Sequence, residues 1–105
     1  MMVLRGVNIF PIQIEKILMN FKELGNNYLI TLTTDDDNDN MTVEVELAEM
    51  FTDDYNRLQQ LSKDITRALK DEILLTPRVK LVPRGTLPVS EGKAVRVVDK
   101  RKVYQ

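Results

Sequence analysis

Apolar residues recur at helical spacing in two segments of the chain, the first of them near the N-terminus. Its apolar positions are Phe10, Ile14, Ile17, Leu18 and Phe21. Residues three and four apart lie on one face of a helix. Pro11 suits the first helical turn, and Gly25 is a residue type that often follows a helix end. The pattern predicts a helix over residues 11 to about 23 with one apolar face.

The second helical pattern lies in the middle of the chain. Its apolar positions are Leu58, Leu61, Ile65, Ala68, Leu69 and Ile73. Thr52, followed by Asp53 and Asp54, is typical of a helix start, because a hydroxyl caps the first amides and carboxylates are favourable at the positive end of the helix dipole. The pair Thr76–Pro77 is expected to end this helix, whose apolar stripe should lie in the core.

Alternating patterns predict a strand hairpin between the two helices. Residues 28–33 and 41–47 alternate between apolar and polar side chains. In the second segment Val43, Val45 and Leu47 share one face, and Thr42, Glu44 and Glu46 share the other. This pattern indicates two strands that are covered on one side.

Shorter apolar stretches complete the predicted order of elements. Val3–Leu4 is expected to form a strand arm before a turn into the first helix, Val79 and Leu81 a short strand, and residues 83–92 a loop. A further strand or arm is expected around Val97. The order strand arm, helix, strand, strand, helix, strand favours an α+β fold, a two-layer sandwich of two main helices on a small mixed sheet.

The acidic segment DDDNDN at residues 35–40 joins the two central strands. Asp35, Asp37, Asp39 and Glu46 fall at the carboxylate positions of a calcium-binding EF-hand loop. However, Asn40 stands where that loop requires glycine, and the flanking segments have strand patterns. We interpret the segment as a solvated acidic turn in which asparagines supply the unusual backbone angles, and we predict no metal site.

Composition narrows the class of protein. The 105 residues, 43% hydrophobic and 30% charged with a net charge of −1, fit a single folded domain over residues 1–105. No apolar run is long enough for a membrane span, and no signal peptide is recognisable, so we expect a cytoplasmic protein without a membrane partner. The chain has no Cys or His, which excludes thiol and imidazole catalysis and Cys/His zinc sites. The sequence pI of about 5.4 opposes a nucleic-acid partner.

A polar loop near the C-terminus carries the strongest candidate chemistry. Within the sequence LPVSEGKAVRVVD at residues 87–99, Gly92 directly precedes Lys93. Glycine permits a sharp backbone turn, and lysine carries a compact charge on a flexible stem, so the pair can deliver an ammonium group to an anionic ligand. The same pair is more often an ordinary solvated turn. No glycine-rich segment that could hold a nucleotide by itself is present.

Two segments together resemble one family. The sequence RGVNIFPIQIE at residues 5–15 and the sequence at residues 87–99 are similar to the C-terminal domain of phenylacetate-coenzyme A ligases, members of the adenylate-forming superfamily. The order of elements between them agrees. In that family the domain follows a large adenylation domain and a hinge residue, and this chain starts just past the hinge position. The resemblance implies a missing N-terminal adenylation domain as partner, although a standalone protein remains an alternative.

The resemblance implies a reaction in two halves, with ATP and coenzyme A as substrates and magnesium in the full-length enzyme. An aryl carboxylic acid reacts with ATP to give an acyl-adenylate, the domain swings on its hinge, and the thiolate of coenzyme A then attacks. Lys93 matches the lysine that stabilises charge in the first half-reaction. In the same loop, within residues 84–99, Ser90 and Glu91 would shape the backbone, and Gly92 would approach the nucleotide.

The N-terminal segment, residues 1–11, matches the glycine loop that faces the site after the swing. Arg5 and Gly6 would line the path of the pantetheine arm, which a side chain at Gly6 would narrow. Arg96 and Arg101 lie in a basic C-terminal stretch and are candidate contacts for substrate phosphates. Two alternatives remain open: the C-terminal domain of an adenylate-forming enzyme that makes no thioester, and a non-catalytic α+β domain that binds a small ligand.

Overall fold

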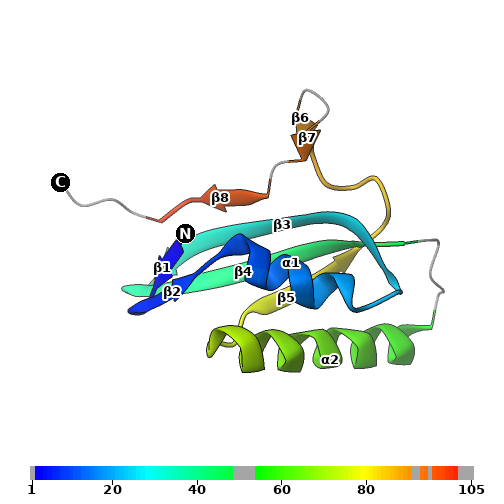
Figure 1. The fold of residues 1–105 in the computed structure, drawn as a ribbon, viewed down its shortest axis with the longest axis horizontal. Helices are drawn as coiled ribbons and strands as arrows, with labels where there is room; N and C mark the ends of the chain where they lie inside the picture. The colour runs from blue at the N-terminus through cyan, green and yellow to red at the C-terminus, as the bar shows by residue number, and fades with distance from the viewer. Residues whose placement is uncertain (1, 49–53, 91–92, 95, 102–105) are drawn as a thin grey trace.

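The computed structural model describes residues 2–48, 54–90, 93–94 and 96–101 (Figure 1). Its elements, in chain order, are β1 Met2–Leu4, β2 Val7–Ile9, α1 Pro11–Met19, β3 Leu24–Asp35, β4 Asn38–Leu47, α2 Tyr55–Ile73, β5 Arg78–Val82, β6 Val89–Ser90, β7 Lys93–Ala94 and β8 Val97–Asp99. The order strand arm, helix, strand, strand, helix, strand is as the hydrophobic pattern predicts. The predicted α+β class is confirmed.

The long antiparallel pair β3–β4 is the centre of a mixed four-stranded sheet. The strand order is β5-β4-β3-β8, with β5 parallel to β4 and β8 parallel to β3. Two further pairs, β1–β2 and β6–β7, are small separate hairpins. The central pair therefore has another strand on each side, which leaves β5 and β8 as the sheet edges.

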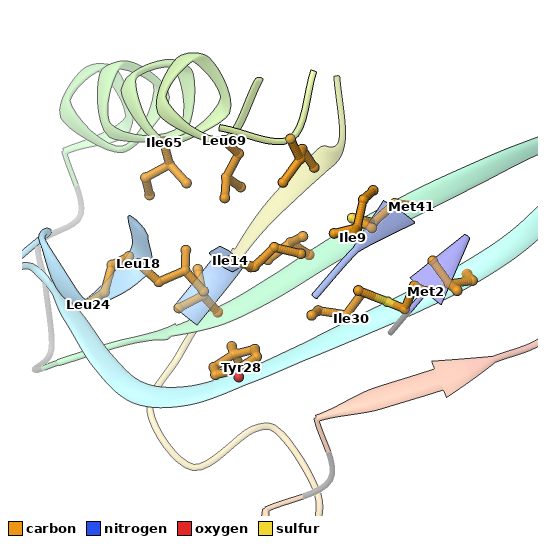
Figure 2. Close-up of a cluster of buried hydrophobic side chains, with 14 of the residues drawn as sticks. Met2, Ile9, Ile14, Leu18, Leu24, Tyr28, Ile30, Met41, Ile65 and Leu69 are labelled. Carbon is orange, nitrogen blue, oxygen red and sulfur yellow. The ribbon is translucent and has the colours of Figure 1, made fainter. Parts of the chain in front are cut away.

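Both helices cover the same face of the sheet. Figure 2 shows Ile65 and Leu69 of α2 over Ile14 and Leu18 of α1, with Ile30 of β3 beneath them. These side chains belong to one buried cluster, to which the β1–β2 hairpin also contributes. The alternation in β3 and β4 therefore has the predicted cause, one face in the core. In the part of the chain that the structure describes, no helix is long and apolar enough to cross a membrane.

The helix boundaries differ from those that the sequence predicts. Helix α1 ends at Met19 rather than near residue 23, and Gly25 lies inside β3 rather than at a helix end. Asp54 caps α2 by accepting a hydrogen bond from the amide of Arg57, and the predicted caps Thr52 and Asp53 lie outside the described residues. Helix α2 ends at Ile73, where Leu74 has a left-handed φ of 64°, before Thr76–Pro77 is reached.

The turn between β3 and β4 is tighter than the acidic segment suggests. Asp35 pairs with Asn38, so that the turn consists of Asp36 and Asp37, whose φ angles are 47° and 66°. Positive φ at both central residues is the geometry of a type I′ hairpin turn. The unusual backbone angles therefore belong to two aspartates, not to the asparagines. Among the described residues, no group of three or more potential metal ligands is present.

The two isoleucines at positions 12 and 14 test the orientation of α1. Ile14 is 0% exposed, whereas Ile12 is 58% exposed on the same helix. We expect Ile14→Ala to lower the free energy of unfolding by about 2–5 kcal/mol, because it leaves a cavity in the core. The matched change Ile12→Ala should alter it by less than about 0.5 kcal/mol. Urea denaturation of the purified chain measures both, and equal losses would contradict this packing.

Candidate functional site

The tip of the β1–β2 hairpin holds Arg5 and Gly6, the residues that the resemblance assigns to coenzyme A. Leu4 pairs with Val7, so these two residues form the whole turn, with φ angles of 51° and 77°. This is again the pattern of a type I′ turn, for which glycine is favoured. A Cβ atom built on Gly6 would have no heavy atom within 4 Å among the described residues, apart from those of Gly6 itself and its two chain neighbours. The space beside Gly6 is therefore not needed for the packing of this chain.

The Arg5 side chain ties the hairpin tip to the sheet. Its Nε atom donates a hydrogen bond to the carbonyl oxygen of Asp39 at 2.9 Å, and its Nη2 atom donates to Oδ1 of Asn40 at 3.2 Å. Both acceptors lie at the start of β4, far away in sequence. The guanidinium therefore fixes the direction of a turn that is otherwise exposed.

Lys93 lies in the β6–β7 hairpin, where Ser90 is its pairing partner. The predicted loop over residues 83–92 is thus interrupted by β6, a short strand that the sequence analysis missed. Glu91 and Gly92, to which the sequence analysis assigns roles beside Lys93, lie outside the described residues. The backbone pairing places Lys93 at the first position of β7, the second strand of the pair.

The two hairpins with candidate residues lie apart. Figure 1 shows β1–β2 at the end of the sheet near the N-terminus, while β6–β7 projects beyond the β8 edge at some distance along the molecule. They are separate surfaces, and the residues assigned to the two half-reactions are not brought together in this chain.

A buried carboxylate lies under the segment that leads to β6–β7. Glu46 of β4 is 5% exposed, although the strand pattern places it on the outer face. Its Oε1 atom accepts a hydrogen bond from the amide of Gly85 at 2.9 Å, and its Oε2 atom accepts from the amide of Leu87 at 2.9 Å and from Nδ2 of Asn27 at 2.9 Å. The loop therefore covers the outer face at this point, where the sequence predicts an open one.

The hydrogen bonds decide the charge state of Glu46. Burial raises the pKa of its carboxyl group. The hydrogen bonds from Gly85, Leu87 and Asn27, together with the charge of Arg84, lower the pKa by more than burial raises it. The pKa of Glu46 therefore lies below the ordinary value for glutamate. The group is consequently a carboxylate at neutral pH, and its four lone-pair positions are largely occupied by donors.

Arg96 leads from the hairpin into β8. Its Nη1 atom donates to the carbonyl oxygen of Asn26 at 3.1 Å and to Oδ1 of Asn27 at 3.3 Å, and its guanidinium lies over the ring of Tyr28 at 4.5 Å from the centroid. Burial, followed by the charge of Glu15, raises the pKa of Tyr28. These contacts give Arg96 a place within the domain, while its contact with a substrate phosphate stays a prediction.

Arg101 joins three segments at the far end of β8. It forms ion pairs with Asp99 at 2.8 Å and with Asp39 at 3.2 Å, and its Nη1 atom donates to the carbonyl oxygen of Val3 at 2.6 Å. Hydrogen bonding to Asp99 raises the pKa of Arg101, while its burial lowers it by less. The guanidinium thus links β8 to the N-terminal hairpin and to β4, and phosphate binding by Arg101 also stays a prediction.

Sequence reasoning did not identify Glu46 or Asn27 as a site. The available signal is the run Gly25-Asn26-Asn27 at the start of β3, of which the sequence analysis interprets only Gly25, as a residue that follows a helix end. Glycine within a strand often marks a bulge. The pairing supports that interpretation, because Leu24 faces Leu47 whereas Tyr28 faces Val45.

Comparisons of sequence agree with this picture. The model of a family described as the AMP-binding enzyme C-terminal domain matches residues 6–101. The phenylacetate-coenzyme A ligase of Escherichia coli K12 is 33% identical over 98% of this chain and 24% of its own length. That of Pseudomonas putida is 38% identical over 96% of this chain and 23% of its own length. The chain therefore spans about a quarter of the curated relatives that it matches.

Solved structures resemble the whole chain. A crystallised domain of phenylacetate-coenzyme A ligase from Bacteroides vulgatus ATCC 8482 is 67% identical, with a TM-score of 0.91 over 99% of this chain and 95% of that one. A 2-hydroxyisobutyryl-CoA ligase with its acyl-adenylate and CoA, in the thioesterification state, is 24% identical, with a TM-score of 0.86 over 97% of this chain and 21% of that one; it shares the fold. By these matches the chain belongs to the family of AMP-binding enzyme C-terminal domains, and it is homologous to phenylacetate-coenzyme A ligases over this domain.

Proposed function

We propose that this chain is the C-terminal lid of an ATP-dependent ligase that joins an aryl acid of the phenylacetate type to coenzyme A. The observation that carries the proposal is the 67% identity, over 99% of the chain, to a domain of a phenylacetate-coenzyme A ligase. The chain covers only 24% and 23% of the length of the two relatives, which supports a second, larger domain as its partner. That adenylation domain would hold the acid and ATP, and this chain would complete the site.

In the first half-reaction, a carboxylate oxygen of the acid attacks the α-phosphorus of ATP. A phosphorus–oxygen bond forms to the acid, the bond to the β-phosphate breaks, and pyrophosphate leaves. Lys93 would place its ammonium group between the carboxylate and the α-phosphate, where negative charge develops in the transition state. Ser90 and Glu91 would shape the loop around it, and Gly92 would let the backbone approach the nucleotide.

Magnesium would accompany ATP in the adenylation domain rather than bind here. Magnesium at nucleotide sites is usually held by the substrate phosphates and one or two carboxylates, so it would lie where ATP is bound. The ion supplies charge neutralisation on the phosphates when it is bound. The contribution of this chain to the same charge would be the ammonium group of Lys93.

In the second half-reaction, the thiolate of coenzyme A attacks the acyl carbon, a thioester forms and AMP leaves. The separation of β1–β2 from β6–β7 supports a rotation between the steps, because two distant hairpins cannot both enter one site in a single orientation (Figure 1). After the rotation, the turn at Arg5 and Gly6 would border the pantetheine path. A glycine there leaves room that this domain itself does not use.

A cavity at the base of the β1–β2 turn bears on the alternative of a non-catalytic ligand-binding domain. It is lined by residues that include Leu4, Asn40 and Pro77, and its volume is about 20 Å³. A cavity of that size holds one water molecule, whereas small-molecule sites are typically about 300–1,000 Å³. This cavity does not favour an organic effector.

Lys93→Ala in the full-length ligase tests the first assignment. We expect acyl-adenylate formation to slow by about 10²–10³-fold, as on loss of one preorganised charge-stabilising group. Conversion of chemically prepared acyl-adenylate to the thioester should stay near normal, because the rotation removes this hairpin from the site. Lys100→Ala, an exposed lysine near the same edge, is the matched control and should leave both steps unchanged. Equal losses in both steps for Lys93→Ala would refute its role.

Gly6→Trp tests the second assignment. We expect it to slow thioester formation while acyl-adenylate formation continues, because the indole would obstruct the pantetheine path. Gly6→Ala is the control for backbone strain, since any Cβ is strained at a φ of 77°. Alanine should therefore have a much smaller effect than tryptophan. If both variants slow thioester formation equally, backbone strain rather than obstruction of the pantetheine path is the cause. If coenzyme A does not consume the acyl-adenylate of the unaltered ligase, the enzyme makes no thioester and the alternative holds.

A further inference from the structure

The segment that carries β6–β7 is attached to the sheet at both of its ends. On the entry side, the amides of Gly85 and Leu87 donate to Glu46. On the exit side, Arg96 donates to the carbonyl of Asn26 and to the side chain of Asn27. Asn27 also donates to Glu46, so the two attachments are one connected group. We call Glu46, Asn27 and Arg96 the anchor cluster.

A bulge in β3 makes this group possible. The pairs Leu24–Leu47 and Tyr28–Val45 show that β3 advances four residues while β4 advances two. The additional residues leave the regular ladder, which allows the carbonyl of Asn26 and the amide side chain of Asn27 to serve Arg96. Gly25 lies within the bulge, where an added Cβ would come to 3.4 Å from the carbonyl oxygen of Glu46.

The hairpin between the attachments is too short to hold its own direction. Its strands pair over Val89–Ala94 and Ser90–Lys93, and an isolated two-stranded hairpin is at best marginally stable in water. Its orientation therefore depends on how the flanking segments are fixed. The carboxylate of Glu46 suits this purpose, because it accepts two backbone amides in charge-assisted hydrogen bonds of defined direction.

Burial of a charge is costly unless it is fully hydrogen-bonded, and an apolar side chain at position 46 would cover the sheet at less cost. No buried side-chain nitrogen or oxygen among the described residues lacks a partner, so the cost at Glu46 is offset by its donors. What the carboxylate adds over an apolar side chain is a fixed orientation of the segment that leads to β6–β7. We propose that the anchor cluster, with Glu46 at its centre, positions the β6–β7 hairpin, and with it Lys93, for acyl-adenylate formation; this inference rests on the proposed function.

Hydrogen exchange in the isolated chain tests the contacts without any activity. Glu46→Gln keeps the size of the side chain but replaces one acceptor oxygen by an amide nitrogen that cannot accept. Gly85 and Leu87 donate to different oxygens of Glu46, so one of the two amides loses its acceptor in this variant. We expect that amide to exchange at least about tenfold faster by NMR, because it no longer has a charged hydrogen-bond partner. Glu44→Gln on the same strand is the matched control, because the Glu44 carboxylate accepts no hydrogen bond from the described residues and only its backbone takes part in the sheet. Unchanged exchange in Glu46→Gln would overturn the anchor cluster.

The rates of the two half-reactions in the full-length ligase test whether Glu46 positions Lys93. We expect Glu46→Gln to slow acyl-adenylate formation by about 10–100-fold, the range that a small misplacement of a catalytic group costs. Thioester formation from prepared acyl-adenylate should be unchanged, a split that general destabilisation would not give. Faster amide exchange with normal adenylate formation would overturn the positioning role.

Asn27→Ala is the second variant, and it applies also if Glu46→Gln does not fold. Asn27 is only partly buried, and its loss removes the link between Glu46 and Arg96. Asn27→Ala should slow acyl-adenylate formation and leave thioester formation unchanged. Equal effects on both half-reactions would contradict the positioning of Lys93 by the anchor cluster. If adenylate formation is insensitive to Lys93→Ala, the proposed function fails instead, while the exchange result for Gly85 and Leu87 still decides whether the anchor cluster exists.

Discussion

The antiparallel pairing of β3 with β4 is the interaction on which the rest of the domain depends. One face of this pair carries alternating apolar side chains, which both helices and the β1–β2 hairpin bury in a single cluster (Figure 2). Its two outer edges each take up one parallel strand, β5 beside β4 and β8 beside β3. The segment with Lys93 lies in the connection between β5 and β8, which leads from one edge of the sheet to the other.

That topology explains why both candidate hairpins are tied to the central pair. Arg5 bonds to the start of β4 and thereby fixes the β1–β2 turn. Glu46, near the other end of β4, holds the segment before β6–β7. The two attachments lie at opposite ends of one strand, so a single rigid element sets the directions of two separate surfaces. The proposed lid would present different surfaces in successive steps, and a rigid strand between the two hairpins would keep their relative directions fixed.

The sequence predicted those features that depend on local periodicity. The helical faces around Ile14 and Ile65, and the alternation in β4, are confirmed because one buried face determines each pattern. The paired motifs around Gly6 and Lys93 gave the family, while the roles of these residues stay predictions. The burial of Glu46 was missed because its amide partners lie 39 and 41 residues away in sequence. Likewise, no local rule distinguished a bulge at Gly25 from a helix end.

The central claim is that this chain supplies groups to substrates held by another domain. ATP–pyrophosphate exchange with phenylacetate tests it most directly, measured on the purified chain and on the same chain joined to its adenylation domain. A domain that is 67% identical was crystallised by itself, and circular dichroism of the purified chain checks that it is folded when the exchange is measured. We expect no exchange above background from the isolated chain and clear exchange from the joined protein. Exchange catalysed by the isolated chain would contradict the account.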